Sequence, residues 1–278
     1  MTIIVADTTC GLPREMLHQR GIWLIPQIVI FGDQSFHDDS ELDTPTFLRK
    51  LKASSTLPKT AAPEPPLYYP IFRLAQEKGE SVIVVAPTTR ASGTFRSAEI
   101  AAQDFPQLDI RVIDTFTIAG NLGSLVLMAD QWSKEGADID AIANRLHEMI
   151  PRGRIYFLVN TLEYLQKGGR IGGARALVGE LLQIKPILTI RDGQVEPFEQ
   201  QRTKRHALAR LIEIVKEQCS KTDESHLCVM QADAVDDAND LASQLQSEMR
   251  CGEIPIYGLP PAIVAHAGPG ALAVGFFI

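Results

Sequence analysis

In the first half of the chain, short continuous apolar runs alternate with stretches of helical period. The apolar runs predict strands at Ile3–Ala6, Ile25–Ile30, Ser81–Ala86 and Ile110–Asp114. Between them, apolar residues recur every three or four positions, which predicts helices at Leu12–Arg20, Thr44–Leu51, Tyr68–Lys78, Gly93–Gln103, Ile118–Lys134 and Ile139–Met149. Continuous apolar strands that alternate with helices are typical of a parallel sheet covered on both faces.

The second half mixes hairpin signals with helical periods, which predicts a mixed-sheet α/β unit. Asp192-Gly193 predicts a tight turn between two of its strands, because this dipeptide favours a hairpin. The expected strands are Ile155–Val159, Ile187–Arg191, Val195–Phe198, Leu227–Gln231, Ile254–Tyr257, Ala262–Ala265 and Leu272–Phe276. The expected helices are Ala174–Leu182, Thr203–Gln218 and Val235–Met249.

Two breaks organise the chain. Residues 53–66 hold four prolines and little periodicity, so we expect a long loop of the kind that often carries binding function. Pro151-Arg152-Gly153 marks the expected domain boundary, which divides the chain into residues 1–152 and residues 153–278. Gly32-Asp33-Gln34 predicts a further hairpin turn.

Composition places the chain among soluble globular proteins. Apolar residues make up 45% and charged residues 22%, which excludes disorder, and no apolar run approaches the ~18 residues of a membrane span. The N-terminus reads as a strand rather than a signal peptide. The four cysteines form no close pair and no metal-type spacing with histidine, so we expect a reduced, cytoplasmic protein without a metal site or other cofactor.

Charge is unevenly distributed. The net charge of −7 argues against nucleic-acid binding, yet residues 152–210 hold eleven Lys and Arg against five Asp and Glu. This local charge of +6 suggests a specific anionic ligand or an acidic partner that docks near Lys167, Arg170, Arg202 and Lys204. A solvated helix face is the alternative interpretation.

Residues 161–173 read Thr-Leu-Glu-Tyr-Leu-Gln-Lys-Gly-Gly-Arg-Ile-Gly-Gly and are the most informative stretch. Glycine loses more conformational freedom on folding than any other residue, so a loop this rich in glycine suggests that something docks there. The glycines do not follow the Gly-x-Gly-x-x-Gly order of dinucleotide-binding proteins, and no Walker sequence is present.

Ser92 and His266 are the main candidates for site chemistry. Ser92-Gly93-Thr94 follows the predicted strand Ser81–Ala86 at the start of a helix, where unpaired N–H groups favour an anion, although a plain N-cap serine is the alternative. His266 precedes a Gly-Pro-Gly turn, which can aim its ring at a neighbouring site; a histidine bonded to a backbone carbonyl is the simpler reading.

Two aspartates also end predicted strands. Asp7 and Asp114 are most simply caps of the turns that follow. A hydrolase or acyltransferase that acts on an acyl ester through Ser92 and His266 is the rival hypothesis, but Ser92 lacks the Gly-x-Ser-x-Gly elbow and no acid is clearly placed to orient the histidine. A binding module for another anionic amphiphile is a third interpretation.

Taken together, the ordered motifs resemble those of the DegV family of bacterial fatty-acid-binding proteins along nearly the whole chain. They are Ile4-Val5-Ala6-Asp7-Thr8, Lys59-Thr60, Ser92-Gly93-Thr94, Lys167-Gly168-Gly169-Arg170-Ile171-Gly172, Lys185-Pro186-Ile187-Leu188, Arg202-Thr203 and His266-x-Gly268-Pro269-Gly270. The loop departs from the usual Pro-Lys-Thr-Ser-Gln-Pro-Ser, because Ala61 stands for its serine, Ala62 for its glutamine and Glu64 for its last serine.

The resemblance implies two α/β domains with a long-chain fatty acid, such as palmitate or oleate, held in a tunnel between them. It places the carboxylate at Thr60, Ser92 and His266, with Lys59, Ala61, Gly93, Thr94 and Gly268 nearby. It further implies a carrier without catalysis of its own, which passes the bound acid to a separate kinase that phosphorylates the carboxyl group for lipid synthesis.

Overall fold

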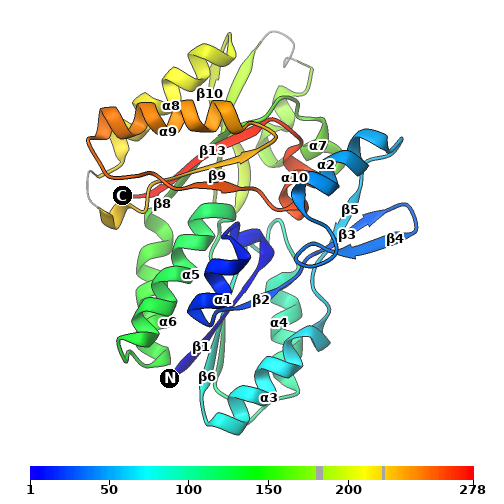
Figure 1. Ribbon diagram of the computed structural model, residues 1–278, viewed down its shortest axis with the longest axis vertical. Coiled ribbons are helices and arrows are strands. Elements are labelled where there is room, and N and C mark those ends of the chain that lie inside the picture. The colour runs from blue at the N-terminus through cyan, green and yellow to red at the C-terminus, as the bar shows by residue number, and fades with distance from the viewer. Residues whose placement is uncertain (180–183, 221–222) are drawn as a thin grey trace.

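The computed structural model describes residues 1–179, 184–220 and 223–278, and the strands in these ranges form three sheets (Figure 1). A four-stranded parallel sheet has the order β2-β1-β6-β7, a six-stranded mixed sheet has the order β10-β9-β8-β13-β11-β12, and a small antiparallel sheet has the order β4-β3-β5. The α/β class predicted from the sequence is confirmed.

The parallel sheet is covered by helices on both faces, as its continuous apolar strands predict. Its strands are β1 (Thr2–Asp7), β2 (Trp23–Ile25), β6 (Ser81–Ala86) and β7 (Ile110–Asp114). Alternate residues of β1 enter different cores: Ile4 packs with α1 (Arg14–Arg20), α5 (Ala119–Lys134) and α6 (Ile139–Met149), whereas Val5 packs with α3 (Tyr69–Lys78) and α4 (Thr94–Gln103). The carboxyl ends of β1, β6 and β7 therefore share one edge, where Asp7 and Asp114 lie.

The six-stranded sheet has one face under two long helices and the other toward the middle of the molecule. Its strands are β8 (Gly153–Leu158), β9 (Lys185–Arg191), β10 (Gln194–Gln201), β11 (Cys228–Ala232), β12 (Ile256–Gly258) and β13 (Ala271–Phe277). Tyr156 and Leu158 pack against α8 (Lys204–Gln218) and α9 (Val235–Met249), while Ile155 and Phe157 point into a separate core. The Asp192-Gly193 hairpin between β9 and β10 is confirmed.

The small sheet corrects two predictions. The expected strand Ile25–Ile30 is broken at Pro26-Gln27 into β2 and β3 (Ile28–Phe31), which belong to different sheets. Proline has no N–H to continue the ladder, so the chain leaves the parallel sheet there. The loop expected at residues 53–66 contains β5 (Lys59–Ala61), which pairs with β3 on the side opposite β4 (Gln34–His37).

Two expected elements in the second half are also wrong in type. Ala262–Ala265 is not a strand but lies in helix α10 (Pro261–Ala267), which starts at a proline and ends at Gly268 with φ +78°. Pro at the first helical position and Gly after the last are common helix boundaries, and these signals outweigh the short apolar run. The expected helix Ala174–Leu182 is a 3₁₀ helix at Gly172–Leu177, and residues 180–182 lie outside the described residues.

Two further helices lie near the middle of the molecule: α2 (Thr44–Ala53) and α7 (Glu163–Lys167). Figure 1 shows α2, α7 and α10 beside one another where the six-stranded sheet meets β3 and β5. Across the described ranges, none of the helices has the length and apolar character needed to cross a membrane. The division of the chain at residue 152 into two domains stays a prediction.

Candidate functional site

A cavity lies between the carboxyl edge of the parallel sheet and the inner face of the six-stranded sheet. Its wall is formed by residues far apart in sequence: Thr60 and Ala61 of β5, Ser92 before α4, and His266 of α10. The carboxyl edge of a parallel sheet is where ligands of open α/β proteins bind. The fold thus brings together the three residues that the sequence nominated.

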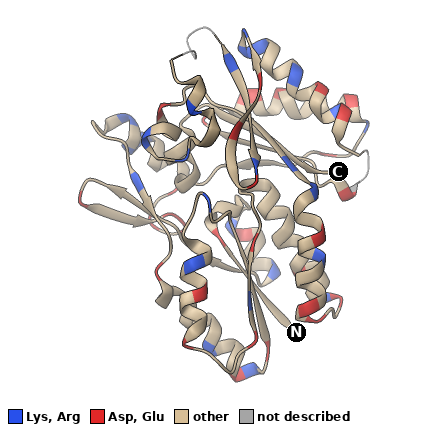
Figure 2. Cartoon of the chain, turned by 180° about the vertical axis from the view of Figure 1, so that it is seen from behind, with Lys and Arg blue, Asp and Glu red and all other residues tan. Residues whose placement is uncertain are grey.

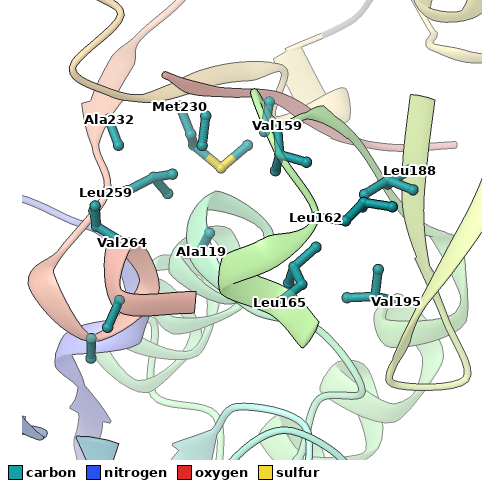
Figure 3. Packing of buried hydrophobic residues seen from close by; sticks show 14 of the residues in the cluster. Ala119, Val159, Leu162, Leu165, Leu188, Val195, Met230, Ala232, Leu259 and Val264 are labelled. Atoms are coloured by element: carbon teal, nitrogen blue, oxygen red, sulfur yellow. The ribbon is translucent and has the colours of Figure 1, made fainter. Parts of the chain in front are cut away.

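Most of the cavity wall is apolar. Because side chains alternate along a strand, β8 and β13 send one set of residues to the helices and the other set to the cavity. The apolar lining includes Ile118, Ile155, Phe157, Leu165, Ile190, Val195, Leu259, Ile263 and Ala273. Behind it stands a buried core that includes Leu162, Leu188 and Met230, and Figure 3 shows this core around the turn of α7. Such a wall suits a hydrocarbon chain.

The part of the cavity wall formed by Thr60, Ser92 and His266 is called the polar end. The lining also contains further polar residues: Thr9, Gln27, Thr88, Arg90, Arg170 and Gln194. The Thr60 Oγ1 atom lies 2.8 Å from His266 Nε2, although the two residues are separated by 206 positions in sequence. His266 Nδ1 is buried without a hydrogen-bond partner. A proton on Nδ1 would be a buried donor without an acceptor, so we place the proton on Nε2, which donates to Thr60. The Thr60 hydroxyl is then free to donate into the cavity.

The environment of His266 keeps the ring neutral. Burial lowers the pKa of His266 to about 4, and the nearby positive charge of Arg170 acts in the same direction. The glycine loop contributes to this burial, since a Cβ on Gly168 would lie 2.2 Å from His266 Nδ1. Gly168 has φ −76°, which any residue adopts, so it is the close approach of the ring that requires glycine here.

Ser92 is the third residue of the polar end. Its Oγ atom accepts a hydrogen bond from the Thr94 N–H at 3.2 Å and lies 2.9 Å from Thr94 Oγ1. The N-cap position of α4 is Gly93 rather than Ser92. Ser92 therefore sits just outside the helix and lines the cavity, as the anion-site interpretation requires.

A network behind Ser92 was missed by sequence reasoning. Thr94 Oγ1 donates to Asp7 Oδ2 at 2.7 Å, and Gln27 Nε2 donates to both Asp7 Oδ2 and Thr94 Oγ1. Asp7 also accepts from the N–H of Thr9, so its role as a cap of the next turn is confirmed. Gln27 was missed because only the break between β2 and β3 brings it to this edge; Pro26 within an apolar run was the available signal.

A second buried carboxylate, Asp38, lies close to this network. It accepts hydrogen bonds from Thr8 Oγ1 and from the Gln27 N–H, each at 2.8 Å, and from the Ala262 N–H at 3.4 Å. Burial raises the pKa of Asp38 to about 7. Burial also raises the pKa of Asp7 above its ordinary value, despite the hydrogen bonds from Thr9, Thr94 and Gln27 that lower it.

The geometry does not assemble a hydrolase. Within the described ranges, Ser92 bonds to Thr94 and His266 bonds to Thr60, while the second ring nitrogen has no acid to orient it. A catalytic triad needs the histidine to reach the serine and a third group to hold the histidine. No group of three or more His, Cys, Asp or Glu in the described residues could hold a metal ion.

The residues expected near the head group fall into different places. Ala61 and Gly93 line the cavity, whereas Lys59 is exposed on β5 and Thr94 is buried behind Ser92. Gly268 lies after α10 against the Tyr164 ring, and a Cβ there would lie 2.5 Å from that ring.

The four cations expected to dock a partner also differ in their surroundings. Lys167 forms an ion pair with Glu163, and Lys204 forms one with Asp237. Arg202 is exposed, two residues before the start of α8. Arg170 is only partly exposed: it donates to the backbone oxygens of Ala91 and Gly168, and so bridges the glycine loop and the loop before α4. Figure 2 shows basic and acidic residues interspersed over both halves of the chain.

Comparison with known proteins places this chain in one family. A family model described as "Uncharacterised protein, DegV family" matches residues 1–278. A DegV domain-containing protein of Halalkalibacterium halodurans is 33% identical over 276 residues, which cover 99% of this chain and 98% of the relative.

Solved structures of DegV family proteins have the same fold as this chain. A fatty-acid-binding DegV family protein of Thermus thermophilus has a TM-score of 0.91 at 28% identity, with 99% of both chains covered. A fatty-acid-binding DegV family protein of Streptococcus agalactiae has the same TM-score and identity, and the match covers 100% of this chain and 98% of that protein. The fold is the α/β fold of these fatty-acid-binding relatives. The chain belongs to the DegV family.

Proposed function

We propose that the protein binds a long-chain fatty acid in this cavity, with the hydrocarbon chain along the apolar wall and the carboxylate at Thr60, Ser92 and His266. The observation that carries the proposal is a cavity between the two sheets whose wall is mostly apolar and whose lining includes two hydroxyls and a neutral histidine. The relatives from Thermus thermophilus and Streptococcus agalactiae, which bind fatty acids, support the same ligand class.

The energetics of such a ligand divide between its two ends. Burying a methylene contributes about 0.8 kcal/mol, so a chain of roughly fifteen contributes ~12 kcal/mol before the costs of association, which are themselves ~4–15 kcal/mol. Each hydrogen bond to the carboxylate contributes about 1.5–3 kcal/mol. The apolar wall therefore supplies affinity, while the polar end fixes which way the acid points.

The bound acid is presented to a separate kinase, which phosphorylates the carboxyl group. We propose this carrier role because the described site has hydrogen-bond donors but no assembled triad, so it suits holding a carboxyl group rather than transforming it. In this proposal, the hydrocarbon chain of the ligand lies in a tunnel between residues 1–152 and residues 153–278. The basic segment with Lys167, Arg170, Arg202 and Lys204 is the proposed docking face.

Lipid extraction followed by mass spectrometry tests the ligand. Purified protein should release long-chain fatty acids, and delipidated protein should melt at a lower temperature than reloaded protein, because a ligand that binds only the folded state stabilises it. A melting temperature that does not change with fatty acids of several lengths would refute the proposal. Release of free acid from an activated ester by the chain alone would instead support a hydrolase.

A further inference from the structure

Behind the polar end, three oxygen atoms form a chain that leads away from the cavity. Asp7 Oδ2 lies 2.7 Å from Thr94 Oγ1, and Thr94 Oγ1 lies 2.9 Å from Ser92 Oγ, which faces the cavity. Asp7 and Thr94 are 1% exposed each, so water does not complete these links. A carboxylate in the cavity would extend the chain by one more link at Ser92.

The number of protons in this chain is one too few for an ionised ligand. Between two carboxylates there are three links, Asp7 to Thr94, Thr94 to Ser92 and Ser92 to the ligand, and each link needs one hydrogen. The two hydroxyls supply only two hydrogens, because a hydroxyl has a single O–H donor. With Asp7 ionised, Thr94 donates to Asp7 and Ser92 donates to Thr94, so Ser92 turns a lone pair toward the cavity.

The neighbours of the chain cannot correct this deficit. The second lone pair of Thr94 Oγ1 already accepts from Gln27 Nε2, and Ser92 Oγ already accepts from the Thr94 N–H. By contrast, the Thr60 arm is balanced, since His266 Nε2 donates to Thr60 and Thr60 donates to the ligand. The deficit therefore belongs to the Asp7–Thr94–Ser92 arm alone.

We propose that Asp7 and Thr94 are positioning residues for the head group, and that Asp7 and the bound carboxyl group share one proton through Thr94 and Ser92. This inference rests on the proposed function, because it needs an acid in the cavity. When the proton is on Asp7, Asp7 donates to Thr94, Thr94 to Ser92, and Ser92 to the ligand carboxylate. When the proton is on the ligand, the same chain runs in the opposite direction.

The surroundings of Asp7 favour such a proton. The other titratable groups that face it are Cys10 after β1, Asp38 after β4 and Tyr68 before α3, and none of the three is a cation. Desolvation raises the pKa of Asp7, which makes a shared proton available closer to neutral pH than an exposed carboxyl group would allow. On the cavity side, the charged or titratable groups in the lining are neutral His266 and the cations Arg90 and Arg170.

The test is the pH dependence of dodecanoate binding, measured by titration calorimetry between about pH 6 and 9.5, where a carboxylic acid in water is ionised. The complex holds one proton more than ionised Asp7 and ionised ligand. The dissociation constant of the wild-type protein should therefore rise by up to about tenfold per pH unit above the pKa of Asp7.

Asp7→Asn carries an N–H where the shared proton would be, so its dissociation constant should stay flat over the same range. Thr94→Val removes the middle of the chain and should also abolish the slope, whereas Thr94→Ser restores the hydroxyl and should restore the slope. Asp38→Asn is the matched control, because Asp38 is buried in the same region but, among the residues that the structure describes, its hydrogen bonds go to Thr8, Gln27 and Ala262 rather than to Thr94 or Ser92. It should keep the wild-type slope.

Equal slopes in the wild-type protein, Asp7→Asn and Thr94→Val would overturn the shared proton while leaving fatty-acid binding intact. If Asp38→Asn loses the slope as well as Asp7→Asn, the pH dependence of the dissociation constant would come from the burial of acidic side chains in general rather than from the Asp7–Thr94–Ser92 chain. Failure of the wild-type protein to bind dodecanoate, palmitate or oleate at any pH would instead refute the proposed function. Thermal melts of each variant establish that it folds. If Asp7→Asn does not fold, the slopes of Thr94→Val and Thr94→Ser decide whether the proton is shared through Thr94.

Discussion

Gly168→Ala should damage the head-group site from the glycine loop, although Gly168 itself does not line the cavity. The added Cβ would lie 2.2 Å from His266 Nδ1 and 3.0 Å from its Cε1 atom, and 2.9 Å from the carbonyl oxygen of Tyr164. Non-bonded carbon contacts are favourable only near ~3.5–4.0 Å, so the imidazole ring has to move by about 1 Å or more. The backbone itself is unstrained, because φ is −76°.

The displaced ring loses its 2.8 Å hydrogen bond to Thr60, and Thr60 then loses the neighbour that fixes its hydroxyl direction. The neutral hydrogen bond between His266 and Thr60 contributes about 0.5–1.5 kcal/mol. Loss of a well-directed hydrogen bond from Thr60 to the carboxylate costs about 1.5–3 kcal/mol. We expect fatty-acid affinity to fall by about tenfold to a hundredfold, since each factor of ten is ~1.4 kcal/mol. Overpacking should also reduce the free energy of unfolding by about 1–3 kcal/mol.

Gly79→Ala is the control, because Gly79 lies after the end of α3 and does not line the cavity. A Cβ there meets nothing within 4 Å, but φ is +64°, so alanine adds backbone strain of about 1–2 kcal/mol and no clash. It should lower the melting temperature and leave the dissociation constant within about twofold, measured by displacement of a fluorescent fatty acid. If both variants bind equally well, His266 does not position the head group and the reasoning fails.

Three further outcomes follow from the site. Ser92→Ala should weaken fatty-acid binding by about tenfold to a hundredfold in titration calorimetry, and Thr60→Ala should be at least as damaging because Ala61 offers no second hydroxyl; wild-type affinity in both would refute the head-group assignment. Arg202→Glu should weaken association with a cognate acyl kinase, in a salt-dependent way, and leave lipid binding unchanged, whereas Arg170→Glu should impair lipid binding too, because Arg170 bridges two loops at the cavity. Acid unfolding should show a contribution from His266: its pKa in the folded state is about 4 against about 6.5 when unfolded, so the unfolded state binds the proton first and stability declines as pH falls through that window, by about 3 kcal/mol at most. The free energy of unfolding of the wild-type protein and of His266→Gln, measured by denaturant melts at each pH, isolates the contribution of His266. Identical pH profiles of the two proteins would contradict the prediction.

The strands and helices of the first half were predictable because their signals are local. An apolar run such as Ser81–Ala86 acts within a few residues of itself. The expected strand Ile25–Ile30 failed for a different reason. Nothing in the run itself says that its two ends pair with different sheets, although Pro26 marks the point of departure.

Helix α10 shows how a correct residue can be nominated with an incorrect element. Four apolar residues before His266 fit a buried strand as well as a buried helix, and only the flanking Pro261 and Gly268 distinguish the two. The helix matters for the site because the last turn carries His266 back to β5. A strand ending at Gly268 would give no reason for the contact with Thr60.

The polar end of the cavity was partly predictable and partly not. Ser92 at a helix start carries a local signal, whereas the direction in which its hydroxyl donates depends on Asp7, which lies 85 positions earlier and reads from its own neighbours as a turn cap. Both roles are compatible, since the Oδ1 atom of Asp7 accepts from the turn while Oδ2 faces Thr94. A carboxylate that only capped the turn would not need Gln27, whose amide is 4% exposed and reaches both Asp7 and Thr94. Gln27→Leu should therefore weaken fatty-acid binding. It should leave the pairing of β2 with β1 and of β3 with β4 and β5 in place, because the backbone N–H of residue 27 still donates to Asp38.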